Sequence, residues 1–249
     1  MTVNPGNSPP VVFISQLGTD GASWKPVIDL LTCGSATVTY DRPGTGDCPP
    51  RPAPNPPLPY SVFADELAAQ LDEHDISGPL VVVGHSAGSL IARMFAARYP
   101  QRTCGVVHVD GSTPRLSLWP AVDKVQQPDG DGSDATHFDR VAGEVEVVEA
   151  ELPLLPAVVV TRTPGRWPAD YPAETIDPLW TAYQRQLARQ HGVPLIVAAD
   201  AGHQIPREAP ALVAYLVDQV VQAARVDQPC EPDPGTVAKS GGTVEQSAS

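Results

Sequence analysis

Short runs of apolar residues recur along the chain and alternate with stretches in which apolar residues fall at helical spacing. The runs are rich in valine and are bounded by polar, glycine or proline residues, which is typical of buried strands. They lie at 11–14, 36–40, 80–85, 106–109, 157–160 and 195–198. The helical patterns lie at 24–31, at 61–74, from Ser86 to near Tyr99, at about 138–150, around Leu179, Tyr183 and Leu187, and from near Pro206 onward. Regular strand–helix alternation predicts an α/β fold: a three-layer sandwich with a mostly parallel six-stranded sheet.

Two segments depart from this pattern. Residues 112–152 are acidic, and they interrupt the strand–helix rhythm between the fourth and fifth strands. This segment contains a turn pattern at 129–132 and a predicted helix at about 138–150. From Asp227 to the end, Pro, Gly, Ser and charged residues dominate, which is typical of disorder. The expected organisation is therefore one domain over residues 1–226 and a disordered tail over 227–249.

Composition narrows the possible partners. The 249 residues carry a formal net charge of −13, which argues against binding to nucleic acid or to anionic membrane surfaces. No apolar run is long enough to span a bilayer, and residues 1–10 lack the basic start and apolar segment of a signal peptide. The four cysteines have no C-x-x-C spacing, so we expect reduced thiols, a cytoplasmic location, and neither a metal nor a cofactor.

The third strand ends in the sequence Gly84-His85-Ser86-Ala87-Gly88, and a helical pattern follows at once. A strand that turns so sharply into a helix holds the serine in a strained conformation with its hydroxyl exposed at the sheet edge. The two glycines avoid the collisions that a Cβ atom would cause in such a turn. The free N–H groups of the following helix can stabilise negative charge nearby. Ser86 is therefore the candidate nucleophile.

Several motifs together resemble the α/β-hydrolase family, over about residues 11–224. They are Trp24, the turn 40–46, the Gly-x-Ser-x-Gly motif at 84–88, Val109-Asp110, and Ala201-Gly202-His203 before the last helix. The resemblance implies a trimmed form of that fold, because the family's first β-hairpin has no room before Val11. It also implies a helical lid at about 112–152, where family members carry one.

The resemblance further implies a Ser-His-acid triad. His203 occupies the position of the family's base, although a surface loop histidine is the alternative; we expect His85 to pack beneath the turn. The family's acid usually follows the fifth strand of this core, but residues 161–167 contain no carboxylate. Asp110, at the end of the preceding strand, is the favoured acid and preserves the chain order of the triad. Asp170 and Asp177 remain alternatives.

The resemblance also places an oxyanion hole at the backbone N–H groups of Leu17 and Ala87. Relatives have His-Gly where this chain has Ser15-Gln16, so Gln16 could instead direct its own amide into the site. For Asp41 and Arg42 we expect a structural ion pair. The functional hypothesis is a serine hydrolase that cleaves an ester, thioester, lactone or amide of a small-molecule acyl substrate through an acyl-enzyme. The alternative is a non-catalytic relative that binds a small ligand.

Overall fold

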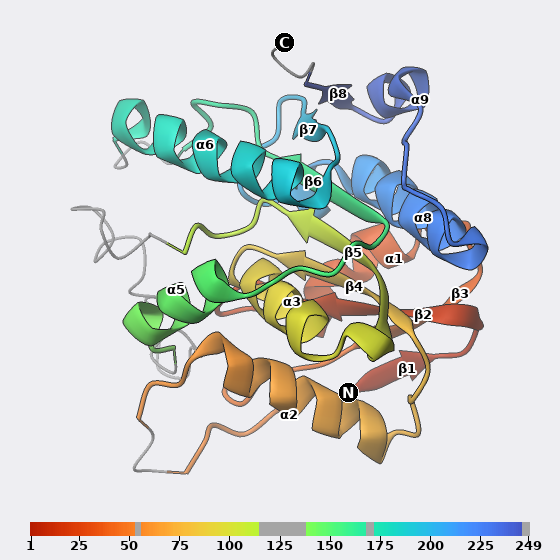
Figure 1. The fold of residues 1–249 in the computed structure, drawn as a ribbon, viewed down its shortest axis with the longest axis vertical. Coiled ribbons are helices and arrows are strands. Elements are labelled where there is room, and N and C mark those ends of the chain that lie inside the picture. The colour runs from red at the N-terminus through yellow and green to blue at the C-terminus, as the bar shows by residue number, and fades with distance from the viewer. Residues whose placement is uncertain (53–55, 115–137, 168–171, 246–249) are drawn as a thin grey trace.

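The computed structural model describes residues 1–52, 56–114, 138–167 and 172–245. These residues form an eight-stranded sheet in the order β1-β3-β2-β4-β5-β6-β7-β8, shown in Figure 1. The strands are β1 (Thr2–Asn4), β2 (Asn7–Ile14), β3 (Ser35–Thr39), β4 (Leu80–His85), β5 (Thr103–Val109), β6 (Ala157–Thr161), β7 (Leu195–Ala198) and β8 (Gly242–Val244). Strands β2 to β7 pair in parallel, and this confirms the predicted α/β class.

Helices cover both faces of this sheet. They are α1 (Lys25–Ile28), α2 (Tyr60–Glu73), α3 (Ala87–Arg98), α5 (Arg140–Glu149), α6 (Ala173–His191), α7 (Ile205–Glu208), α8 (Pro210–Val226) and α9 (Pro234–Lys239). Alternate strand residues separate the two faces: Val82 and Val106 pack with α2, α3 and α6, whereas Val81 and Val107 pack with α1 and α8. Because side chains along a strand alternate between faces, each central strand buries apolar residues on both sides. None of the described helices is long and apolar enough to cross a bilayer.

The sheet has two more strands than the six predicted. Strand β1 runs antiparallel to β3, and β8 runs antiparallel to β7, so each edge of the parallel sheet ends in a short antiparallel strand. Before β2 the described residues contain the single strand β1, which pairs with β3, and not the two-stranded β-hairpin of the family. All three residues of β1 are exposed, so no hydrophobic pattern marks this strand in the sequence.

The expected disordered tail is also corrected. Helix α9 begins after Asp233, whose carboxylate accepts a hydrogen bond from the Thr236 N–H at 2.7 Å. Cys230 and Val237 are buried against the core, and the Gly241 carbonyl accepts from the Ala199 N–H at 2.8 Å. The prediction of disorder from composition was wrong because a few buried side chains and one added strand are sufficient to order a polar segment. Residues 246–249 lie outside the described residues.

The predicted lid at 112–152 is described only in part, because 115–137 lie outside the described residues. Its second half forms α5, close to the helix expected at 138–150. Phe138 stacks on Phe63 of α2 with ring centroids 4.0 Å apart, and Glu146 accepts hydrogen bonds from the N–H and hydroxyl of Ser61. Helix α5 is therefore fastened to the start of α2, on the same side of the sheet as α3 (Figure 1).

The sheet register brings the predicted site residues to one edge. His85 lies opposite Val109 in the β4–β5 pair, and Val109 lies opposite Val160 in the β5–β6 pair. The residues that follow these strands, Ser86 and Asp110, therefore emerge side by side. Ligands of open parallel sheets bind at these carboxyl ends.

Candidate active site

Ser86 lies between β4 and α3 in a backbone conformation that is rare outside glycine, with φ 55° and ψ −122°. The two glycines of the motif make this turn possible. A Cβ atom on Gly84 would lie 2.3 Å from the Gly88 carbonyl oxygen, and one on Gly88 would lie 2.3 Å from the Ile14 carbonyl oxygen. The Ser86 N–H donates to the Val109 carbonyl at 3.0 Å. The strained turn is thus held between two neighbouring strands.

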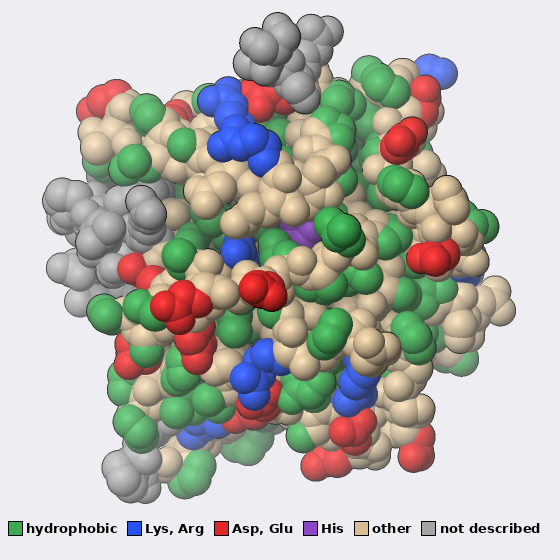
Figure 2. Space-filling model, in the orientation of Figure 1, with side chains coloured by type: hydrophobic (Ala, Val, Ile, Leu, Met, Phe, Trp, Pro, Cys, Tyr) green, Lys and Arg blue, Asp and Glu red, His purple; other side chains and the backbone are tan. Residues whose placement is uncertain are grey.

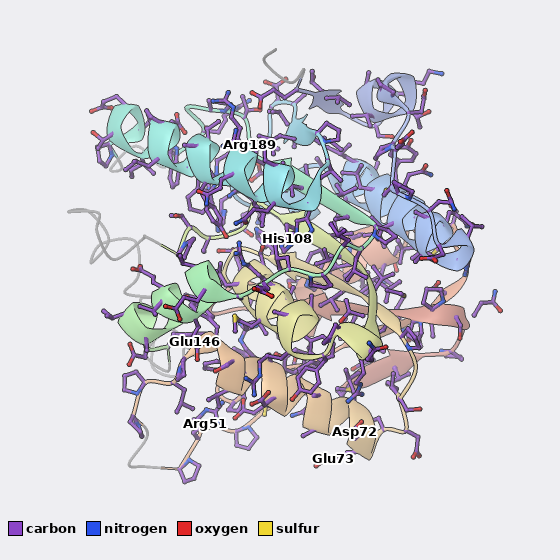
Figure 3. The ribbon with its side chains drawn as sticks, in the orientation of Figure 1. Arg51, Asp72, Glu73, His108, Glu146 and Arg189 are labelled. Carbon is purple, nitrogen blue, oxygen red and sulfur yellow. The ribbon has the colours of Figure 1, made fainter. Side chains whose placement is uncertain are left out.

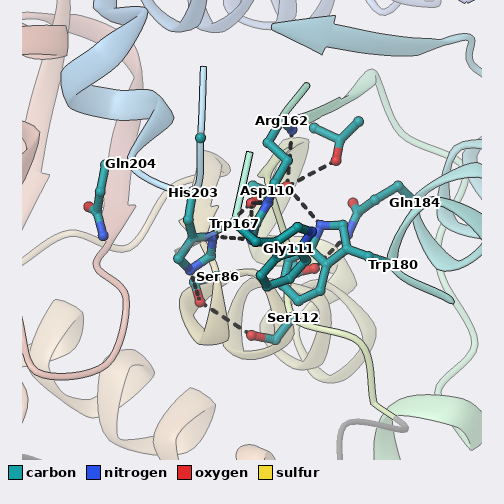
Figure 4. A network of polar contacts seen from close by, with 12 residues as sticks. Ser86, Asp110, Gly111, Ser112, Arg162, Trp167, Trp180, Gln184, His203 and Gln204 are labelled. Atoms are coloured by element: carbon teal, nitrogen blue, oxygen red, sulfur yellow. Dashed lines mark hydrogen bonds and ion pairs between the residues drawn. The ribbon is translucent and has the colours of Figure 1, made fainter. Parts of the chain in front are cut away.

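Three side chains form a continuous chain of hydrogen bonds at this edge, shown in Figure 4. His203 Nε2 lies 2.9 Å from Ser86 Oγ, and His203 Nδ1 lies 2.7 Å from Asp110 Oδ2. With a proton on Nδ1 directed at Asp110, Nε2 is free to accept the serine proton. Among the sequence candidates for the acid, Asp110 is therefore the carboxylate that the structure brings to His203.

The other two acid candidates are not found at the imidazole. Asp177 accepts hydrogen bonds from the Gly165 N–H and the Trp167 indole N–H, so its carboxylate stabilises the turn after β6. Asp170 lies outside the described residues.

Asp110 is completely buried and has a positive φ of 43°. Its Oδ1 accepts from the Thr161 hydroxyl at 2.9 Å and the Trp180 indole N–H at 2.8 Å, while its Oδ2 accepts from Arg162 Nε at 2.7 Å. Burial alone would raise the pKa of this carboxyl, but the Arg162 charge and the His203 hydrogen bond outweigh burial and hold the pKa well below its usual range. Asp110 is therefore ionised at neutral pH.

Sequence reasoning missed Arg162. This buried guanidinium has its Nη2 2.7 Å from both Asp110 Oδ2 and His203 Nδ1. It also lies between two indole rings, 3.8 Å from the Trp167 centroid and 4.5 Å from the Trp180 centroid. The one available signal was its position directly after β6, at the turn where the family usually carries its acid. In this structure the carboxylate beside His203 comes from the end of the neighbouring strand β5, and an arginine faces it.

Burial lowers the pKa of His203, the Asp110 hydrogen bond opposes that effect, and the Arg162 charge adds to it. The imidazole is therefore neutral at neutral pH and able to accept a proton. His85 lies beneath the turn as expected, and its Nε2 is 2.7 Å from the His203 carbonyl oxygen. Burial lowers the pKa of His85 to about 3, so this ring is neutral and donates its N–H to that carbonyl. His85 thus holds the backbone of the His203 loop.

The loop after β2 is fixed by side chains from elsewhere in the chain. Buried Arg42 donates to the Ser15 carbonyl at 2.7 Å and to the Gln16 carbonyl at 2.6 Å. The Gln16 and Gln204 amides donate to each other, both at 3.1 Å, so Gln16 is directed at the loop of His203 and not into the site. The expected pairing of Arg42 with Asp41 is replaced by these bonds, and Asp41 accepts from the Gly21 N–H at 2.8 Å.

The two residues expected to form the oxyanion hole follow fixed neighbours in the chain. Ala87 begins α3 directly after Ser86. Leu17 is half-buried against the core and follows the Ser15 and Gln16 carbonyls that Arg42 holds. The Ser112 hydroxyl, which the sequence did not single out, lies 3.2 Å from Ser86 Oγ. Within the described residues, no group of histidine, cysteine and carboxylate side chains is arranged to hold a metal ion.

Comparison with known proteins decides the family. A sequence model of the alpha/beta hydrolase fold matches residues 9–152, more than half of the chain. The chain belongs to the α/β-hydrolase family. This α/β-hydrolase is also similar to RutD of Escherichia coli O1:K1 / APEC, whose name assigns it provisionally as a carbamate hydrolase. The two are 33% identical over 108 residues, and the match covers 42% of this chain and 38% of RutD, well under half of that relative's length.

Solved structures agree on the fold. An esterase from Thermogutta terrifontis superposes with a TM-score of 0.63 at 18% identity, over 90% of this α/β-hydrolase and 93% of the esterase. Est816, described as an N-acyl homoserine lactone degrading enzyme, gives 0.60 at 20% identity, over 87% and 95% of the two chains. At this level of identity the likeness extends to the fold alone, and the family resemblance expected from the sequence is confirmed.

Proposed function

We propose that this hydrolase of the α/β-hydrolase type is a serine hydrolase that works through an acyl-enzyme. The single observation that carries the proposal is the unbroken chain of hydrogen bonds from Ser86 through His203 to Asp110. A serine hydroxyl is a poor nucleophile unless a base within hydrogen-bond reach removes its proton, and here that base is neutral and oriented.

In the proposed reaction, Ser86 Oγ attacks the acyl carbon while His203 Nε2 takes the hydroxyl proton. The Asp110 carboxylate stabilises the imidazolium that forms, and the N–H groups of Leu17 and Ala87 stabilise the negative charge on the acyl oxygen. His203 then gives its proton to the leaving group, which departs. A water molecule activated by His203 hydrolyses the acyl-enzyme and regenerates Ser86.

The proposed substrate is a small molecule with an ester, thioester, lactone or amide bond. The names of the similar proteins fit this range, because they include an esterase, a lactone-degrading enzyme and a protein provisionally assigned to carbamates. In the mechanism proposed for this chain, each of these bond types would leave an acyl or carbamoyl group on Ser86.

One observation favours the alternative, a non-catalytic ligand-binding relative. Arg162 Nη2 is a donor at 2.7 Å from His203 Nδ1, and a guanidinium has no acceptor. If Nδ1 accepts from Arg162, the imidazole proton moves to Nε2 and is directed at Ser86, so the serine has no base.

A fluorophosphonate probe separates the two. Under our proposal the probe attaches to Ser86 of the full-length protein, as peptide mass spectrometry will show, and p-nitrophenyl acetate is turned over. Ser86→Ala should lose both the label and the turnover while keeping its thermal unfolding midpoint. A wild-type protein that is folded and takes no label would establish the non-catalytic alternative.

A further inference from the structure

A crevice of about 280 Å³ opens between α3 and α6 on the face shown in Figures 2 and 3. Arg93 of α3 and Tyr183 of α6 line it together with Arg189 and Gln190, and Val148 and Leu179 add apolar walls. Figure 3 labels Arg189 on α6 and His108 in the layer beneath that helix. The crevice has several times the roughly 30 Å³ that one water occupies in the liquid.

Arg93 is the unusual member of this crevice. It is only 3% exposed, and Nη1 donates to the Gln190 side-chain oxygen at 2.9 Å. Its Nε has no hydrogen-bond partner. The buried Tyr183 hydroxyl lies beside this guanidinium, which opposes the rise that burial causes in the pKa of Tyr183. None of the ion pairs formed by the described residues includes Arg93. A buried charge is costly unless it is paired, so the site lacks a counter-charge.

The groups around Arg93 are neutral or positive. Burial lowers the pKa of His191 to about 4 and holds the pKa of His108 well below its usual range, and the nearby Arg93 charge acts in the same direction on both. Arg189 adds a second cation at the exposed side of the crevice. No carboxylate of the described residues lines it. In a chain of net charge −13, this is a locally cationic pocket.

We propose that the crevice binds a small monocarboxylate with a short apolar body. A guanidinium presents parallel N–H groups that match a carboxylate, and the Tyr183 hydroxyl supplies a further donor beside it. The walls at Val148 and Leu179 suit a hydrocarbon chain and not the fully polar surface of a phosphate. Arg93 lies seven residues along α3 from Ser86, roughly 10 Å by helix rise, while Thr113, which follows Ser112, extends the crevice toward the nucleophile. The proposal does not depend on Ser86 being catalytic.

Isothermal titration of the full-length protein with sodium butanoate tests the proposal. We expect saturable binding of butanoate and none of butanamide, which has the same shape without the charge. Arg93→Met should weaken butanoate binding by about tenfold or more, because a charge-assisted hydrogen bond is lost. Tyr183→Phe should weaken it by a smaller factor. Arg185→Gln is the matched control on the same helix: Arg185 pairs with Glu245 and does not line the crevice, so affinity should not change.

Several results would overturn the proposal. Wild-type protein that does not bind butanoate, or that binds butanamide equally well, has no carboxylate site here. Tighter binding of inorganic phosphate than of butanoate would refute the assignment of the ligand class. If Arg93→Met fails to fold, then Tyr183→Phe and Arg189→Gln decide the matter, because wild-type affinity in both would place butanoate elsewhere.

Discussion

Replacing Arg162 by methionine tests the electrostatics of the site most directly. Arg162 contacts both Asp110 and His203, and its positive charge disfavours a second positive charge on the imidazole. Without it the pKa of His203 rises. A base acts only above its pKa, so the acid limb of the pH–rate profile should move to higher pH.

The structure allows the size of this shift to be worked out. Two unit charges 4 Å apart interact by about 4 kcal/mol at an effective dielectric constant near 20, which corresponds to about three pKa units. The His203 side chain is 28% exposed, so solvent screens part of this repulsion. We therefore expect the limb to move up by about one to two pH units, somewhat less than the unscreened Coulomb value.

The assay is kcat/KM for p-nitrophenyl acetate from pH 4 to 9, with circular dichroism at each pH to follow folding. Arg162→Lys keeps a charge and should show a smaller shift, which also provides a second variant if methionine leaves Asp110 unpaired and destabilises the fold. Arg166→Gln is the matched control, since Arg166 is exposed and pairs with Asp200. An acid limb that stays in place or moves to lower pH in both Arg162 variants would refute the reasoning.

Three more predictions follow from the same geometry. Asp110→Asn should lower kcat by about three to four orders of magnitude because the amide can favour the wrong tautomer, and Asp177→Asn, measured in the same assay, should change it by only a few fold. Gly88→Ala should destabilise the protein by roughly 1–3 kcal/mol, because the new Cβ would meet the Ile14 carbonyl; thermal unfolding should show a midpoint lower by about 2–4 °C per kcal/mol. Stability should fall as pH drops from about 6.5 toward 4, since the unfolded chain protonates histidines that the fold keeps neutral; urea unfolding should show a loss of up to about 1.4 kcal/mol per pH unit for each such histidine. Burial lowers the folded-state pKa of His85 to about 3 and that of His191 to about 4, and a stability that is flat between pH 7 and 4.5 would contradict this account.

The parts of the site that follow from local chemistry could be predicted from the sequence. Ser86 could be found because its turn needs two glycines between an apolar strand and a helix, and all of these are adjacent in the chain. His203 and Asp110 each required a parallel sheet in which separate strands end at one edge, and alternation of apolar runs indicates such a sheet. Strand order favours Asp110 over Asp177, and the structure shows Asp177 of α6 bonded to the turn after β6.

What the sequence left hidden depends on contacts between distant segments. In the sequence, nothing distinguishes Arg162 from any other polar residue that follows a strand. Its contact with Asp110 forms because β5 and β6 are neighbours in the sheet. The Gln16–Gln204 pair joins residues 188 positions apart, and no local pattern marks either partner. Strands β1 and β8 were not predicted because a three-residue strand at the sheet edge buries little apolar surface and leaves no hydrophobic pattern. Composition describes the average of a segment, whereas order at 234–244 depends on a few buried side chains.

The two antiparallel edge strands have a consequence for handling the protein. A parallel sheet that ended at β3 and β7 would present rows of unpaired N–H and C=O groups, which invite other chains to add strands and aggregate. Segments near the two ends of the chain occupy these positions, at Thr2–Asn4 and Gly242–Val244. A chain shortened to residue 226, the boundary that composition suggests, would uncover β7 while leaving the proposed triad intact. We therefore expect a protein that lacks the C-terminal segment to be less soluble and to keep its hydrolytic activity.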